Sequence, residues 1–156
     1  MDWTHLIDAA RLLAGATGTP ARGRPRQIML KRAVSSAYYA MFHALCVSNA
    51  DTLIGTSPAA DRMTWRRTYR ALEHGPAKNR MEQQLANLPP VIQDFAKSFS
   101  VLQEQRHKSD YDPDAYLQRS FVIRLIDRAE SAIRALFSAD VGERRSLAAL
   151  VLLRDR

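Results

Sequence analysis

Features of secreted and membrane proteins are missing from this sequence. Cys46 is the single cysteine, so no internal disulfide can form, and we expect its side chain to fill space in a helix. No apolar run approaches the roughly 20 residues that a membrane span requires. Residues 1–14 lack the basic start and apolar core of a secretion signal, because Asp2 and Asp8 interrupt them. We therefore expect a cytoplasmic protein that does not enter a membrane.

Patterns of metal, cofactor and common catalytic sites are also missing. The six glycines are scattered instead of forming a phosphate-binding loop, and no nucleophile elbow occurs. The four histidines lie far apart, and none has the spacing of a zinc site: His5, His43, His74 and His107. We therefore expect no metal and no cofactor.

Acidic residues are the minority among the charged ones. The chain has 16 Asp and Glu against 23 Lys and Arg, which gives a net charge of +7 and a pI near 10.1. Lysine is rare among the basic residues, and arginine can fork onto phosphates and stack on bases. The excess suits an anionic partner such as nucleic acid, a nucleotide or an acidic protein. Codon composition and solubility are the alternative explanation.

The spacing of apolar residues is helical along the whole chain, and no segment has the alternation of a strand. Gly75-Pro76 is expected to end a helix, and Asp114 to cap the start of another. A chain of 156 residues suffices for one domain with a core. The prediction is one all-α domain over residues 1–156, an antiparallel bundle of four to five main helices. The predicted helices cover 2–14, 27–48, 59–75, 77–87, 91–106, 114–138 and 140–153, with loops at 15–26 and 49–58.

The C-terminal extension, residues 139–156, carries several apolar side chains close together. A monomer surface rarely shows such a patch. Two explanations stay open at this stage: the extension packs on the bundle, or it contacts a second copy of the chain.

Residues 106–113 form the most informative stretch. They combine cations, an imidazole, a hydroxyl and carboxylates between two predicted helices, where unsatisfied backbone groups can also hold a polar ligand. Such side chains can bind a phosphate or transfer a proton, and we expect a nucleotide or RNA site here. The structural alternative is that the aspartates cap a helix and Arg106 neutralises them. The candidates are Arg106, His107, Lys108, Asp110 and Tyr111.

A second candidate set lies on the helix predicted at 27–48. Four polar residues recur at spacings that place them on one face: Arg32, Ser36, Tyr39 and His43. They could border a nucleotide or a subunit interface. The alternative is that Tyr39 and His43 are partly buried and bonded within the bundle.

Two arginine-rich segments are candidates for nucleic-acid binding. In one, Trp65 and Tyr69 alternate with arginines, a pattern that suits base stacking with phosphate contact. The alternative is an amphipathic helix with packed aromatic rings and solvated arginines. The other segment is the loop at 15–26. The candidate arginines are Arg22, Arg24, Arg26, Arg66, Arg67 and Arg70.

Two motifs in this order resemble a known family. The first is Ala37-Tyr38-Tyr39-Ala40-Met41-Phe42-His43-Ala44 in a long helix, and the second is Arg106-x-x-x-Asp110-Tyr111-Asp112-Pro113. Together they look like the HEPN family (higher eukaryote and prokaryote nucleotide-binding), in its branch with Arg-x-x-x-Asp-Tyr. The resemblance covers roughly residues 27–138 and implies a helical bundle that forms a homodimer with a shared cleft.

The resemblance also implies functions. Many members are metal-independent endoribonucleases, often toxins of toxin–antitoxin or phage-defence systems, and others are non-catalytic partners of small nucleotidyltransferases. In the nucleases an arginine is followed by four to six residues and then by a histidine. Arg106 fits the arginine and would hold the scissile phosphate. Tyr111, Asp112 and Pro113 occupy the positions expected for the histidine.

Arg67 and His74 match the nuclease spacing literally but lie in the wrong segment, and we interpret this match as coincidence. Three hypotheses follow. The first is an RNA- or nucleotide-binding module that is the toxin-side component of a toxin–antitoxin or phage-defence system. The second is an endoribonuclease that uses Arg106 as phosphate clamp and His107 or Tyr111 with Asp110 for proton transfer. The third is a subunit that docks on a nucleotidyltransferase-type antitoxin or another acidic protein.

Overall fold

The computed structural model describes residues 2–16 and 25–154, and these residues form α-helices and one 3₁₀ turn but no strand. The all-α prediction is confirmed. The predicted loop at 15–26 falls mostly outside the described residues, and so do Arg22 and Arg24. The elements are α1 (Trp3–Leu13), α2 (Gln27–Leu53), α3 (Arg62–Arg70), α4 (His74–Gln83), the 3₁₀ turn (Leu85–Asn87), α5 (Pro90–Tyr111), α6 (Arg119–Ser138) and α7 (Val141–Leu152).

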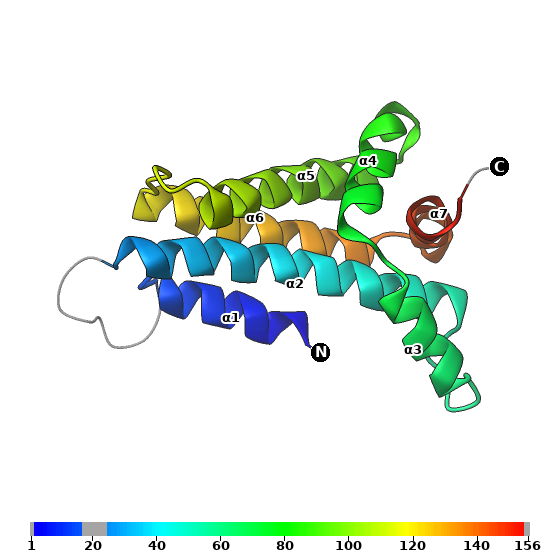
Figure 1. Ribbon diagram of the computed structural model, residues 1–156. Coiled ribbons are helices and arrows are strands. Elements are labelled where there is room, and N and C mark those ends of the chain that lie inside the picture. The colour runs from blue at the N-terminus through cyan, green and yellow to red at the C-terminus, as the bar shows by residue number, and fades with distance from the viewer. Residues whose placement is uncertain (1, 17–24, 155–156) are drawn as a thin grey trace.

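Helices α1, α2, α5 and α6 form the bundle, with α2 in contact with the other three (Figure 1). The chain direction reverses between α1 and α2 and between α5 and α6, so neighbours in sequence are antiparallel. The predicted apolar stripe of α2 lies in the core, where four of its side chains have no exposed surface: Val34, Tyr38, Met41 and Leu45. An antiparallel helical bundle was therefore the correct prediction.

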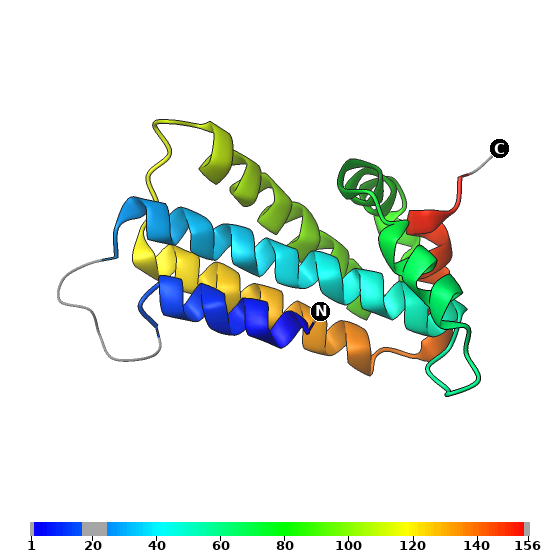
Figure 2. The same ribbon diagram turned by 60° about the horizontal axis from the view of Figure 1, so that its bottom comes forward.

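Helices α3, α4 and α7 lie at the end of the bundle where α2 finishes (Figure 2). In α7 the side chains of Leu147, Ala148 and Val151 are buried against the core. Arg80 of α4 donates a hydrogen bond to the carbonyl of Val151 at 2.8 Å. Of the two explanations for the apolar C-terminal extension, packing on the bundle is the one observed for residues 141–152.

Two predicted boundaries near α2 and α4 were wrong. Helix α2 continues to Leu53 instead of ending at 48, because Ala50 and Thr52 are buried and Thr52 donates to the carbonyl of Ser48 at 2.8 Å. Gly75-Pro76 does not end a helix but lies in the first turn of α4. The first N–H groups of a helix have no partner within it, so the missing N–H of proline costs no hydrogen bond there.

The boundaries around residues 106–118 were also wrong. Helix α5 continues to Tyr111, and α6 begins only at Arg119, so Asp114 is not its cap. Asp112 instead accepts a hydrogen bond from the backbone N–H of Asp114 at 2.9 Å. The Gln27 side chain pairs with both the N–H and the carbonyl of Leu117, at 2.8 and 2.9 Å. The backbone turns at residues 113–114, and the bonds from Gln27 hold the rest of the connection against the start of α2.

Several arginines satisfy the carbonyl groups at helix ends. Arg119 donates to the carbonyls of Ala14 and Gly15 just past α1, and Arg145 donates to that of Thr52 in the last turn of α2. Such carbonyls have no partner within their own helix. Part of the arginine excess is therefore structural. None of the described helices is both long enough and apolar enough to span a membrane.

Candidate functional site

Arg106 lies in α5, and contacts on two sides hold its guanidinium in place. Its Nε donates to Asp110 Oδ2 at 3.1 Å, and Asp110 Oδ1 accepts from Ser35 Oγ of α2 at 3.1 Å. Its Cζ lies 5.5 and 5.2 Å from the ring centroids of Tyr38 and Tyr39. Among the described residues nothing else accepts a hydrogen bond from this guanidinium. The two Nη groups therefore retain their donors for a ligand.

The carboxylate of Asp110 was a candidate for proton transfer, but its contacts favour another role. Both of its oxygens are engaged, one by Arg106 and one by Ser35, and its side chain is only 22% exposed. A carboxylate held in this way orients the guanidinium instead of exchanging protons with a ligand. We interpret Asp110 as a positioning residue for Arg106.

His107 and Tyr111 lie one turn apart at the surface of α5. Their ring centroids are 4.8 Å apart, and Tyr111 is 68% exposed. Neither side chain has a hydrogen-bond partner among the described residues that would orient it for proton transfer. The structure therefore provides no fixed acid–base group at these two positions.

A cavity of about 290 Å³ opens beside Arg106 and is rich in polar groups. It includes the predicted ligand-binding residue Lys108. Lys78 of α4 faces it as well and pairs with Glu82 and Glu104 at 3.4 and 3.2 Å. Cations outnumber carboxylates in the wall, which consists of Lys78, Gln103, Glu104, Arg106, His107 and Lys108.

His74, which sequence analysis did not select, lies beside Arg106. It is the first residue of α4, and its Nδ1 shares a hydrogen bond of 2.5 Å with the hydroxyl of Tyr38. Its ring stacks on Phe42 with centroids 3.8 Å apart and lies 5.9 Å from the ring of Tyr39. Burial lowers the pKa of His74, and the charge of Arg106 lowers it further.

His43, one helical turn after Tyr39 on α2, is paired with a tyrosine in the same way. Its Nδ1 shares a hydrogen bond of 2.5 Å with the hydroxyl of Tyr69 in α3, and its ring centroid is 6.3 Å from that of Tyr39. Burial lowers the pKa of His43. The side chains of Tyr39, Arg106, His74 and His43 thus form one group, which we call the Tyr39 cluster.

Helix α3 continues this surface. The indole of Trp65 is covered by Arg62, whose Cζ is 4.3 Å from the ring, and by Tyr69, whose centroid is 5.4 Å away. Its Nε1 donates to Asp51 at 2.8 Å. The faces of Trp65 are thus used by this chain, and the alternative of packed aromatic rings is the one observed. The exposed arginines Arg66, Arg67 and Arg70 lie on the same helix.

Two other predicted arginines, Arg26 and Arg32, form no hydrogen bond or ion pair with the Tyr39 cluster. Arg26 precedes the first residue of α2 and is exposed, and Arg32 is exposed on α2. Neither has a hydrogen-bond or ion-pair partner among the described residues that would connect it to the Tyr39 cluster. The described residues also contain no group of three His, Cys, Asp or Glu side chains that could hold a metal ion.

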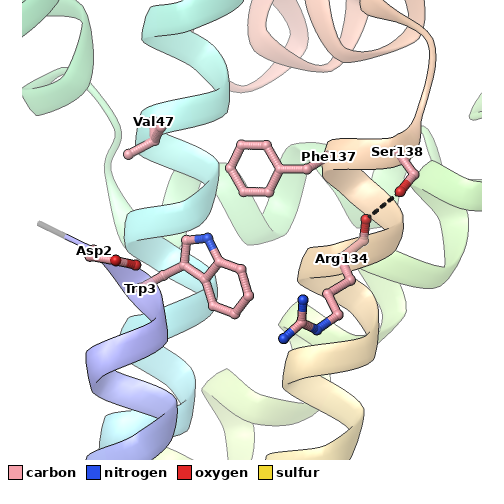
Figure 3. A pocket seen from close by; sticks show the side chains of 6 residues that line it. All are labelled: Asp2, Trp3, Val47, Arg134, Phe137 and Ser138. Atoms are coloured by element: carbon pink, nitrogen blue, oxygen red, sulfur yellow. Dashed lines mark hydrogen bonds between the residues drawn. The ribbon is translucent and has the colours of Figure 1, made fainter.

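Another pocket, which we call the Trp3 pocket, lies elsewhere, between α1, α2 and α6 (Figure 3). Its volume is about 670 Å³, and the rings of Trp3 and Phe137 present their faces to the same open side. These rings are nearly parallel, at 13°, with centroids 6.5 Å apart. The pocket has one carboxylate, from Asp2, and no histidine. None of the predicted site residues lines it.

Comparison with protein-family models, with curated proteins and with solved structures finds no match.

Proposed function

We propose that this chain is a HEPN-like protein that binds the phosphate groups of single-stranded RNA or of a nucleotide at Arg106. The observation that carries the proposal is the position of the Arg106 guanidinium and its free donors. Asp110 and two tyrosine rings fix its position, while the two Nη groups have no partner among the described residues. A fixed, forked guanidinium beside an open polar cavity is suited to a phosphate.

The length of the surface supports an RNA strand over an isolated nucleotide. Contacts that begin at Ser35 and Arg106 continue along α2 as far as Asp51 and Trp65. This part of α2 is about 24 Å long at 1.5 Å per residue. Exposed arginines of α3 lie at the far end. A surface of this length with cations at both ends can contact several nucleotides.

The geometry favours binding without cleavage. Tyr111, where the nuclease pattern has its histidine, is exposed and has no fixed partner. The endoribonuclease hypothesis stays a prediction, and so do the toxin-side role, the homodimer and the nucleotidyltransferase partner that the resemblance implies. Exposed apolar side chains near this end of the bundle would suit a protein contact: Ile28, Met29, Tyr111 and Tyr116.

The proposal is tested by measuring the affinity of a fluorescein-labelled oligouridylate as salt concentration rises. Arg106→Ala is expected to weaken binding at least tenfold, since a charge-assisted bond to phosphate is lost. Binding by the wild type should weaken as salt rises, because phosphate contacts release counterions. Arg134→Ala is the control, because Arg134 lies on α6 at the Trp3 pocket.

Equal affinity of Arg106→Ala and wild type would contradict the assignment of the site. Competition with uridine monophosphate separates the two ligands. A nucleotide site would be blocked by the monophosphate at low concentration, whereas an RNA site requires a strand.

A further inference from the structure

Two tyrosine–histidine pairs lie near Tyr39, one between α2 and α4 and one between α2 and α3. We infer that His74 and His43 are hydrogen-bond donors to the same phosphate as Arg106, each locked by its tyrosine in the Nε2–H tautomer. The inference rests on the proposed function, because it adds to that site His74, which lies outside the HEPN-like motifs, and gives a role to His43, which lies within the first motif. It also assigns a role to His74, whose spacing from Arg67 in the sequence we interpret as coincidence.

The Tyr38–His74 pair fixes the proton on the outer nitrogen of His74. Tyr38 is fully buried, and the sole partner of its hydroxyl among the described residues is His74 Nδ1. Burial raises the pKa of Tyr38, so the hydroxyl keeps its proton. A buried hydroxyl must donate to its neighbour or lose a hydrogen bond. Nδ1 is therefore the acceptor, and a neutral imidazole then carries its hydrogen on Nε2.

The Tyr69–His43 pair has the same geometry. The hydroxyl of Tyr69 lies 2.5 Å from Nδ1 of His43, and burial raises the pKa of Tyr69 while it lowers that of His43. A protonated hydroxyl thus faces a neutral imidazole, and donation from Tyr69 again leaves the hydrogen of His43 on Nε2.

Both outer nitrogens are accessible to a ligand. Neither Nε2 atom has a hydrogen-bond partner in the described residues, and neither is among the buried polar atoms that lack one. They therefore reach solvent. The hydroxyl of Tyr39 likewise reaches solvent. The ring centroid of Tyr39 lies 5.2 Å from Cζ of Arg106, 5.9 Å from the ring of His74 and 6.3 Å from that of His43.

The donors of the Tyr39 cluster favour an anion with several oxygen acceptors. The Tyr39 cluster offers N–H and O–H donors, and the carboxylate next to it, Asp110, is already engaged by Arg106 and Ser35. The non-bridging oxygens of a phosphodiester match such a set of donors. The same arrangement makes the histidines poor general bases, because the lone pair of each Nδ1 is taken by a tyrosine.

The test compares two substitutions of His74 with the labelled oligouridylate. In His74→Gln the side-chain amide supplies an N–H donor on a shape close to that of the imidazole, whereas His74→Ala removes the donor. We expect His74→Ala to weaken binding about tenfold, as for a hydrogen bond to a charged group, and His74→Gln to stay within about threefold of wild type. Thermal unfolding of both variants checks that each is folded.

A second readout is the ¹⁵N NMR spectrum of the imidazoles in the free protein. The expected pattern is a protonated Nε2 and an unprotonated Nδ1 for His74 and His43. A protonated Nδ1, or equal affinity of all three proteins, would overturn the inference. Equal loss in both variants would do the same, because it indicates a packing role.

The two proposals fail in different ways. If the wild type binds neither RNA nor nucleotide, the proposed function fails and the inference with it. If Arg106→Ala abolishes binding but His74→Ala does not, the proposed function stands and the role of His74 is wrong.

Discussion

At the scale of single residues, the Tyr39 cluster places two neutral histidines near the guanidinium of Arg106, which is always charged. Burial lowers the pKa of both His74 and His43, and Arg106 adds to the effect on His74. A protonated imidazole would repel the guanidinium and would lose the hydrogen bond from its tyrosine. Both histidines are thus neutral when the Tyr39 cluster is packed.

This arrangement predicts a loss of stability in mild acid. The unfolded chain binds protons on these histidines near their ordinary pKa of 6.5, whereas the folded chain binds them only at lower pH. Their contribution is therefore complete above pH 6.5 and is lost as pH falls through the lowered pKa values. Each is expected to contribute about 1 kcal/mol or less, since the rings are half-buried and water screens them.

Urea unfolding at pH 7 and pH 5 tests this, because the range lies above the ordinary pKa of the carboxylates. The His43→Gln, His74→Gln double variant should lose less stability between the two pH values than the wild type does. His5→Gln, an exposed position on α1, is the control. An unchanged loss in the double variant would assign the acid sensitivity to other groups.

Sequence patterns could locate part of this site. Arg106, Tyr39 and His43 stood out because they belong to polar patterns on helices, and the structure places them together. His74 could not be found in this way. Its position depends on how α4 turns back after α3, and its neighbours Gly75 and Pro76 suggested a helix end.

At the scale of elements, contacts at helix ends help to assemble the bundle, and the end of α1 is the clearest case. Gly15 has a φ of +70°, and the N–H of Ala16 bonds to the carbonyl of Arg11 at 2.8 Å, so the helix closes with a glycine in the left-handed region. Arg119 then donates to the carbonyls of Ala14 and Gly15. These contacts join the end of α1 to the start of α6.

Gly15→Ala is expected to lower the free energy of unfolding by about 1 kcal/mol, because an L side chain is strained at this φ. The new Cβ would also lie 3.3 Å from Cγ of Pro25. Gly142→Ala is the matched control. Gly142 lies within α7, and nothing lies within 4 Å of its Cβ position. That substitution should stabilise the protein by about 0.5 kcal/mol.

Urea unfolding of the two variants gives both values. A Gly15→Ala protein as stable as the wild type would show that the end of α1 contributes little to the bundle.

Apolar spacing predicted which segments are helical but not where α5 and α6 meet. The aspartates at 112 and 114 resemble a helix start, yet a turn forms at residues 113–114 and bonds from the distant Gln27 hold Leu117 outside a helix. Helix α5 gains its last turn from the Arg106–Asp110 pair and from Ser35 of α2. Such long-range contacts leave no local pattern in the sequence.

At the scale of the whole molecule, two features of different chemistry lie on different helices. The Tyr39 cluster and the cavity beside Arg106 involve α2, α3, α4 and α5, and they offer polar and cationic groups. The Trp3 pocket involves α1, α2 and α6, and it presents aromatic faces (Figure 3). Some basic residues of the chain therefore bond to carbonyl groups at helix ends, and others form a cationic surface near α2.

The central claim is the location of the phosphate-binding surface, and hydrogen–deuterium exchange with and without the oligouridylate tests it most directly. The account predicts slower exchange in the first turn of α4 and in residues 103–108 of α5, since a ligand at Arg106 and His74 would hold both segments. The Arg106→Ala protein should show no such change. Slower exchange confined to α1 and the end of α6, around Trp3 and Phe137, would contradict the claim.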